Sequence, residues 1–112
     1  MNHLLHEQMA ADDAIEQARI NADQNWMVWA LQSVYMIALH EPEFTTDDVW
    51  DRLAFRWPES RTHENRAMGA IMRQARAKQW ARPSNRYEPT RRKNNHGRPI
   101  RVWVSDIHGI DF

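Results

Sequence analysis

The stretch "FTTDDVWDRL", Phe44–Leu53, decides the fold, because it contains the clearest helix start in the chain. Thr45 is a favourable N-cap residue, and Asp48 follows three residues later, as in a capping box with Asp in place of Glu. Phe44 and Val49 occupy the two positions of a hydrophobic staple. Asp47 adds a second carboxylate at the positive end of the helix dipole. The stretch therefore predicts a helix that begins directly after Thr45.

This helix is expected to end near Arg56, because Trp57-Pro58 follows and the residue before a proline disfavours helical geometry. Its buried stripe is predicted to consist of Val49, Trp50 and Leu53.

Two further helices flank this one in the sequence. The upstream helix is expected from Ala22 to about His40, and it is apolar nearly all round, which predicts a central core helix. The downstream helix is expected from His63 to about Gln79, with Ser60 or Thr62 as its cap. Its apolar side consists of Met68, Ile71, Met72 and Ala75. Its opposite, basic side consists of Arg66, Ala70, Arg73 and Ala77, flanked by His63 and Gln74.

The pattern changes from helix to strand after Trp80. Residues 80–83 predict a short strand that ends at a proline, and residues 86–98 predict a basic loop. Residues 100–104, "IRVWV", alternate and are β-branched, which is a strong strand signal. Residues 106–112 form a short tail in which Ile107, Ile110 and Phe112 are expected to dock on the body.

Charge is distributed unevenly in a chain with no net charge. Residues 1–60 hold three basic and eleven acidic residues, whereas residues 61–112 hold twelve basic and four acidic residues. The two halves therefore carry −8 and +8, and the basic half suggests a surface for a polyanion. The alternative is two solvated faces of opposite charge that attract each other. The sequence also leaves open whether the acidic N-terminal half covers the basic surface.

Composition excludes several classes of protein. The 112 residues predict one domain, and the absence of cysteine excludes disulfides and thiolate metal sites. The first residues do not resemble a signal peptide, and the most apolar run is shorter than the ~20 residues of a membrane span. We expect a soluble cytoplasmic protein that does not contact a membrane. We find no catalytic residues, no metal ligands and no cofactor motif, and therefore expect a protein that is not an enzyme.

The order of these elements resembles the winged helix-turn-helix superfamily over about residues 25–105. The segments that carry the resemblance are "FTTDDVWDRL", "HENRAMGAIMRQARAKQW" and "HGRPIRVWVS". The phrase "RAMGAIMRQARAKQW" is similar to small phage or prophage DNA-binding proteins. The link "FRWPESRT" departs from the family, because it is longer than the tight turn of many helix-turn-helix proteins.

The resemblance implies an α+β, mostly α fold with an extra N-terminal helix (residues 1–22), a winged domain (23–105) and a tail (106–112). It implies that the second helix of the motif reads double-stranded DNA and that the following hairpin, the wing, holds the backbone. The recognition residues would be Thr62, His63, Arg66, Ala70, Arg73, Gln74 and Ala77. The wing residues would be Arg91, Arg92, Lys93, His96, Arg98 and Arg101.

Three functions follow from these observations. The first is a phage-type transcription regulator, or a replication or recombination accessory factor, that dimerises through the thin apolar face of residues 4–22. The second is an interaction module, an adaptor or inhibitor that grips a host protein with the acidic half. The third is an RNA-binding winged domain.

Overall fold

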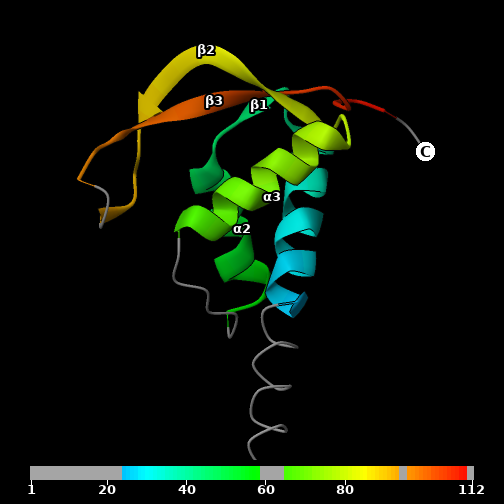
Figure 1. Ribbon diagram of the computed structural model, residues 1–112, viewed down its shortest axis with the longest axis horizontal. Coiled ribbons are helices and arrows are strands. Elements are labelled where there is room, and N and C mark those ends of the chain that lie inside the picture. The colour runs from blue at the N-terminus through cyan, green and yellow to red at the C-terminus, as the bar shows by residue number, and fades with distance from the viewer. Residues whose placement is uncertain (1–23, 59–64, 94–95, 111–112) are drawn as a thin grey trace, which may run out of the picture.

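The computed structural model describes residues 24–58, 65–93 and 96–110. Its elements are a helix over residues 24–40, here named the core helix, then β1 (Glu43–Phe44), α2 (Thr46–Arg56), α3 (Asn65–Ala77), β2 (Ala81–Pro89) and β3 (Pro99–Ser105). The helices lie beneath the sheet, and the β2–β3 hairpin reaches beyond them on one side (Figure 1). The predicted α+β class is confirmed. The predicted dimerisation segment, residues 4–22, lies outside the described residues.

The start of α2 follows the local signals in its sequence. Thr45 is extended (φ −123°, ψ 171°), and its backbone N–H donates a 2.9 Å hydrogen bond to Oδ2 of Asp48. Phe44 and Val49, the predicted staple, are both buried. The backbone N–H of Trp57 then donates to the carbonyl of Leu53, where the helix ends. The predicted start and end of this helix are therefore confirmed, whereas the Thr45 hydroxyl is buried without a hydrogen-bond partner among the described residues, so only the Asp48 half of the expected capping box is formed.

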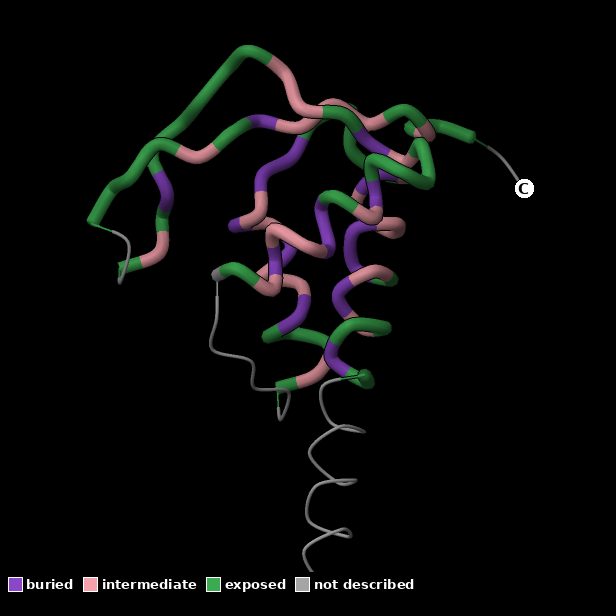
Figure 2. The backbone as a smooth tube through the Cα atoms, in the orientation of Figure 1, coloured by how far each residue is buried: buried purple, intermediate pink, exposed green. Residues whose placement is uncertain are grey.

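The core is built mainly from one face of each helix. The predicted apolar side of α3 is buried in full, since Met68, Ile71, Met72 and Ala75 are each no more than 2% exposed. The core helix buries one face, which consists of Trp26, Ala30, Val34 and Ala38 together with Ser33. Figure 2 shows these buried segments facing one another between the helices. Burial all round the core helix was a wrong expectation, because Val28 is 61% exposed.

Tryptophan pairs join the core helix to α2 and its C-terminal end. The rings of Trp29 and Trp57 stack with centroids 5.4 Å apart, and those of Trp26 and Trp50 are tilted with centroids 5.8 Å apart. Such pairs add about 0.5–1.5 kcal/mol beyond the area they bury. These tryptophans therefore stabilise helix packing.

The sheet is antiparallel with the order β1-β3-β2. Strand β2 runs to Pro89, so the prediction of a strand ending at Pro83 and a loop from Arg86 was wrong. Between Pro83 and Tyr87, β2 advances four residues while β3 advances two, which marks a bulge. The Ser84 hydroxyl bridges the bulge by donating 2.6 Å to the carbonyl of Val102. Pro83 and Pro89 are tolerated in β2 because it is an edge strand. A proline there can direct the position of its missing N–H to solvent, so no hydrogen bond of the sheet is lost.

The residues after β3 fasten the sheet to the end of the core helix. The Ser105 hydroxyl donates to the carbonyl of Ala38, and the Gly109 N–H donates to the carbonyl of Leu39. Ile107 is partly buried against the core as predicted, whereas Ile110 is 47% exposed and does not dock. Phe112 lies outside the described residues.

A buried carboxylate ties the hairpin to α2. Asp47 is only 3% exposed, and its Oδ1 accepts a 2.8 Å hydrogen bond from the hydroxyl of Thr90, which is also buried. Its Oδ2 accepts a 2.6 Å bond from the backbone N–H of Arg91. The Thr90 hydroxyl in turn accepts from the N–H of Arg92. The point where the chain leaves β2 is therefore fixed to the first turn of α2.

We predict that Asp47→Ala lowers the free energy of unfolding by about 2–4 kcal/mol, because it leaves the Thr90 hydroxyl and the Arg91 N–H without their acceptor. Urea denaturation monitored by tryptophan fluorescence measures this change. Asp51→Ala is the matched control, since the Asp51 side chain is 72% exposed and its loss should cost less than about 1 kcal/mol. Equal effects of the two variants would contradict a special role for Asp47.

Candidate nucleic-acid interface

Helix α3 presents a basic face opposite its buried one. Arg66 and Arg73 are exposed, and Ala70 lies between them, half-buried. Gln74 is half-buried and Ala77 is exposed. The 3.6-residue period that buries the apolar side places these residues on the outer side. Thr62 and His63, the other predicted recognition residues, lie outside the described residues.

Arg91 of the hairpin is paired with acidic side chains of α2. Its Nη2 lies 2.8 Å from Oδ2 of Asp51 and 3.1 Å from Oδ1 of Asp48. Hydrogen bonds to Asp51 and Asp48 raise the pKa of Arg91 above its usual value, so the guanidinium stays charged at any working pH. All three side chains are exposed to solvent, so the energy of this network is modest. The structure thus places Arg91 against α2.

Arg92 also contacts α2, whereas the residues after it occupy the end of the hairpin. The Arg92 guanidinium lies 4.3 Å from the centroid of the Trp50 ring, in cation–π geometry. Lys93 is exposed. His96 and Gly97 both have positive φ, 51° and 72°, and form the turn before β3. Both residues suit this backbone, since His is enriched and Gly is unstrained in the left-handed region.

Arg98 and Arg101 lie on opposite faces of the hairpin. Ile100 lines a groove with residues of α3, and side chains alternate along a strand. Arg98 lines the same groove, whereas Arg101 points to the other face. There Arg101 covers the ring of its cross-strand partner Tyr87, with 5.0 Å to the centroid, and hydrogen-bonds the Tyr87 hydroxyl. The structure therefore does not bring the predicted wing residues onto one surface.

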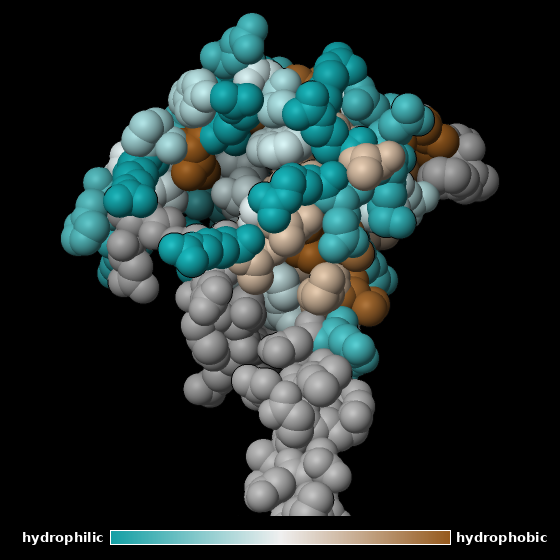
Figure 3. All heavy atoms as spheres, in the orientation of Figure 1, coloured by the Kyte–Doolittle hydropathy of each residue, from teal (hydrophilic) through white to brown (hydrophobic). Residues whose placement is uncertain are grey.

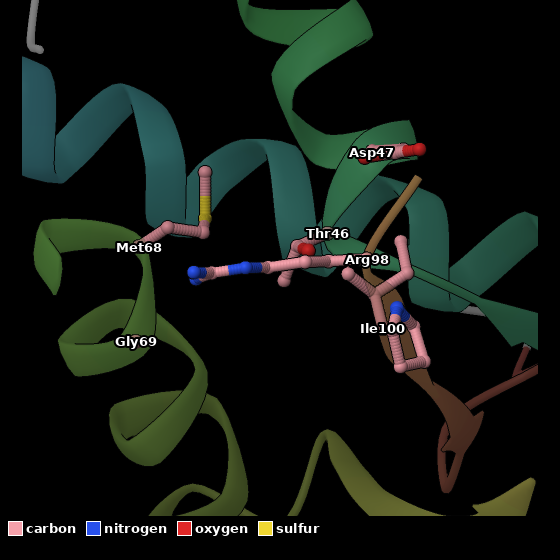
Figure 4. Close-up of a pocket in the computed structure, with 7 residues that line it drawn as sticks. Thr46, Asp47, Met68, Gly69, Arg98 and Ile100 are labelled. Atoms are coloured by element: carbon pink, nitrogen blue, oxygen red, sulfur yellow. The ribbon is translucent and has the colours of Figure 1, made fainter. Parts of the chain in front are cut away.

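A groove of about 270 Å³ separates α3 from the hairpin. It is lined by Thr46, Asp47, Met68, Gly69, Arg98, Pro99 and Ile100. Arg98 extends from the start of β3 toward Met68 of α3 (Figure 4). In the view of Figure 3, hydrophilic side chains gather over the hairpin and along α3, which border this groove.

The charged groups at the groove are Arg98 and Asp47 in its lining and the nearby arginines of α3. Within the described ranges, Arg66, Arg73 and Arg98 form no salt bridge with a carboxylate. Asp47 is the acidic residue of the lining, and both of its oxygens already accept hydrogen bonds from the hairpin. Arg98 in the lining and Arg73 beside Gly69 therefore border one groove without carboxylate partners in this part of the chain.

Sequence reasoning missed Gly69, Pro99 and Ile100 as groove residues. Gly69 had a readable signal, because it is a glycine in the middle of a predicted helix, where glycine is unfavourable. Pro99 and Ile100 had none, since only the strand register brings them opposite α3.

Comparisons with known proteins do not identify a relative of this chain. No protein-family model, curated protein or solved structure matches the chain. Over the described ranges, no helix combines the length and apolarity needed to cross a membrane. The same residues contain no group of three or more His, Cys, Asp or Glu side chains that would hold a metal ion.

Proposed function

We propose that the protein is a winged helix-turn-helix protein that binds double-stranded DNA, with α3 as its recognition helix and the β2–β3 hairpin as its wing. The order of elements supports this proposal: a helix, a short strand, two helices and then a hairpin. The strand order β1-β3-β2 supports it too, because the short strand before the two helices pairs with the second strand of the hairpin.

The observation that carries the function is that arginines without carboxylate partners in the described part of the chain lie on both sides of one groove. Arg73 lies on the α3 side, since its Nη1 is 3.6 Å from a Cβ built at the lining residue Gly69, and Arg98 lines the groove from the hairpin. Arg66 is a further exposed cation of α3. A duplex neutralises such cations with phosphates and releases counterions, which drives binding in a salt-dependent way. A merely solvated basic helix would not need a facing cation from a separate element.

The proposed roles of the side chains follow from where they lie. The major groove of B-DNA is about 12 Å wide and admits a helix such as α3. Arg66 and Arg73, two turns apart, would donate to guanine edges, while Ala70 between them allows close approach. Arg98, Lys93 and His96 would contact the backbone. Arg91 and Arg92, which contact α2, would hold the wing in place.

We predict that Arg98→Ala weakens binding to every duplex alike and lowers the steepness of log K against log salt by about one unit. Arg91→Ala should leave this slope unchanged, because Arg91 is paired with Asp48 and Asp51. Fluorescence anisotropy with a random duplex of about 25 base pairs, titrated over salt, measures both values. No binding by the unaltered protein at low salt would refute the proposed function.

We predict that Arg73→Ala weakens binding to a selected target site by about 1–3 kcal/mol more than binding to random DNA. The target site is first obtained by selecting duplexes from a random library. Competition of the two duplexes for wild type and variant then gives the specificity ratio. An unchanged specificity ratio would show that Arg73 does not read a base.

A protein-interaction module is the second candidate, because Phe55 of α2 is 84% exposed. An exposed large aromatic side chain is typical of the centre of a protein interface. In this case the adaptor or inhibitor would use its acidic half, and charge reversal at Asp12, Asp13 and Glu16 would abolish its activity. Under the DNA-binding proposal the same reversal should leave duplex affinity intact or raise it. An RNA-binding role would show as a preference for duplex RNA over duplex DNA in the same assay.

A further inference from the structure

Gly69 stands at a position where the fold does not require glycine. It lies in the interior of α3, where glycine destabilises a helix relative to alanine. Its φ is not in the left-handed region, unlike those of Gly97 and Gly109. A Cβ built at Gly69 meets only the Nη1 atom of Arg73, at 3.6 Å, which is an ordinary contact. Neither backbone conformation nor packing therefore explains this residue.

The bare backbone of Gly69 forms part of the groove wall. Gly69 and Met68 line it from α3, and Arg98, Pro99 and Ile100 line it from the hairpin (Figure 4). A side chain at Gly69 would narrow this space. The volume of about 270 Å³ is slightly below the roughly 300–1,000 Å³ of drug-sized ligand pockets, so the groove suits a small group.

We propose that the groove seats one phosphodiester of the DNA backbone over Gly69, with Arg98 paired to its phosphate. This inference rests on the proposed function and deepens it, because it identifies which part of the DNA enters the groove. The phosphate matches Arg98, which has no carboxylate partner among the described residues. The apolar surfaces of Pro99 and Ile100, which are exposed and half-buried respectively, match the deoxyribose.

Asp47 and Arg73 are the other charged groups at the seat. Asp47 is the acidic group of the lining, and its oxygens are occupied by Thr90 and Arg91. Arg73, one turn after Gly69, adds a second positive charge beside the seat. With the phosphate seated over Gly69, the Arg73 side chain would pass beside the backbone toward the bases.

Gly69→Ala tests the seat, because the seat predicts opposite effects on stability and on binding. The added methyl group should raise the melting temperature by a few degrees, since alanine favours the helix. It should weaken binding to the selected site and to random duplex alike, by about tenfold, the effect of one misfitting methyl group. Differential scanning fluorimetry and anisotropy measure the two effects on the full chain.

Two further variants sharpen the test. Ala54→Gly, at an exposed position of α2, is the matched control: it should lower the melting temperature and leave DNA affinity unchanged. In an Arg98→Ala background, Gly69→Ala should cost less than about twofold, because both changes remove the same phosphate contact.

The outcomes separate the seat from the proposed function. If the unaltered protein binds DNA and Gly69→Ala binds equally well, the seat is overturned while the function stands. If Gly69→Ala weakens binding only to the selected site, Gly69 faces a base edge, and the seat is again overturned. If the unaltered protein does not bind DNA at all, the function and the seat are overturned together.

Discussion

The buried carboxylate of Asp47 is the interaction on which the arrangement of α2 and the hairpin depends. A charge removed from water is costly unless it is hydrogen-bonded, and Asp47 has a donor for each oxygen. Its place in the first turn of α2 adds the favourable field of the helix dipole. Both donors come from residues 90 and 91, where the chain leaves β2. Because Asp47 also lines the groove, the same bonds join the hairpin to the part of the groove wall that α2 supplies.

The contact between α2 and the hairpin also explains part of the neutrality of the chain. The acidic half supplies Asp48 and Asp51, and the basic half supplies Arg91, so some opposite charges cancel at this contact. Arg86 pairs with Glu43 across the sheet in the same sense. For these residues, the alternative of two oppositely charged faces that attract each other is thus correct. It does not account for Arg98 or for the outer face of α3, whose cations have no such partners in the described ranges.

Local signals in the sequence predicted the helices. The features that were not predicted depend on contacts between residues far apart in the chain. The start of α2 depends on residues within five positions of one another, and the buried side of α3 depends on one helical period. The extent of β2 depends on β3 and on a bulge closed by Ser84, which composition does not reveal. Arg91 looked like a phosphate contact because its partners lie 40 and 43 positions earlier in the chain. Arg98 and Arg101 looked equivalent until the strand register separated their faces.

The cations of the hairpin face different surfaces, and this limits how many phosphates a single copy would contact under the proposed function. Arg91 and Arg92 contact α2, and Arg101 lies on the far face with Tyr87. The described cations of α3 and of the hairpin end without a carboxylate or ring partner are Arg66, Arg73, Arg76, Lys93 and Arg98. These would neutralise about five phosphates at most, fewer than the roughly six to ten contacts of strongly salt-dependent DNA binders. One copy would therefore bind any duplex weakly, and two copies on paired half-sites would double the number of contacts. A dimer of the kind predicted would therefore supply, through its second copy, the affinity that one groove cannot.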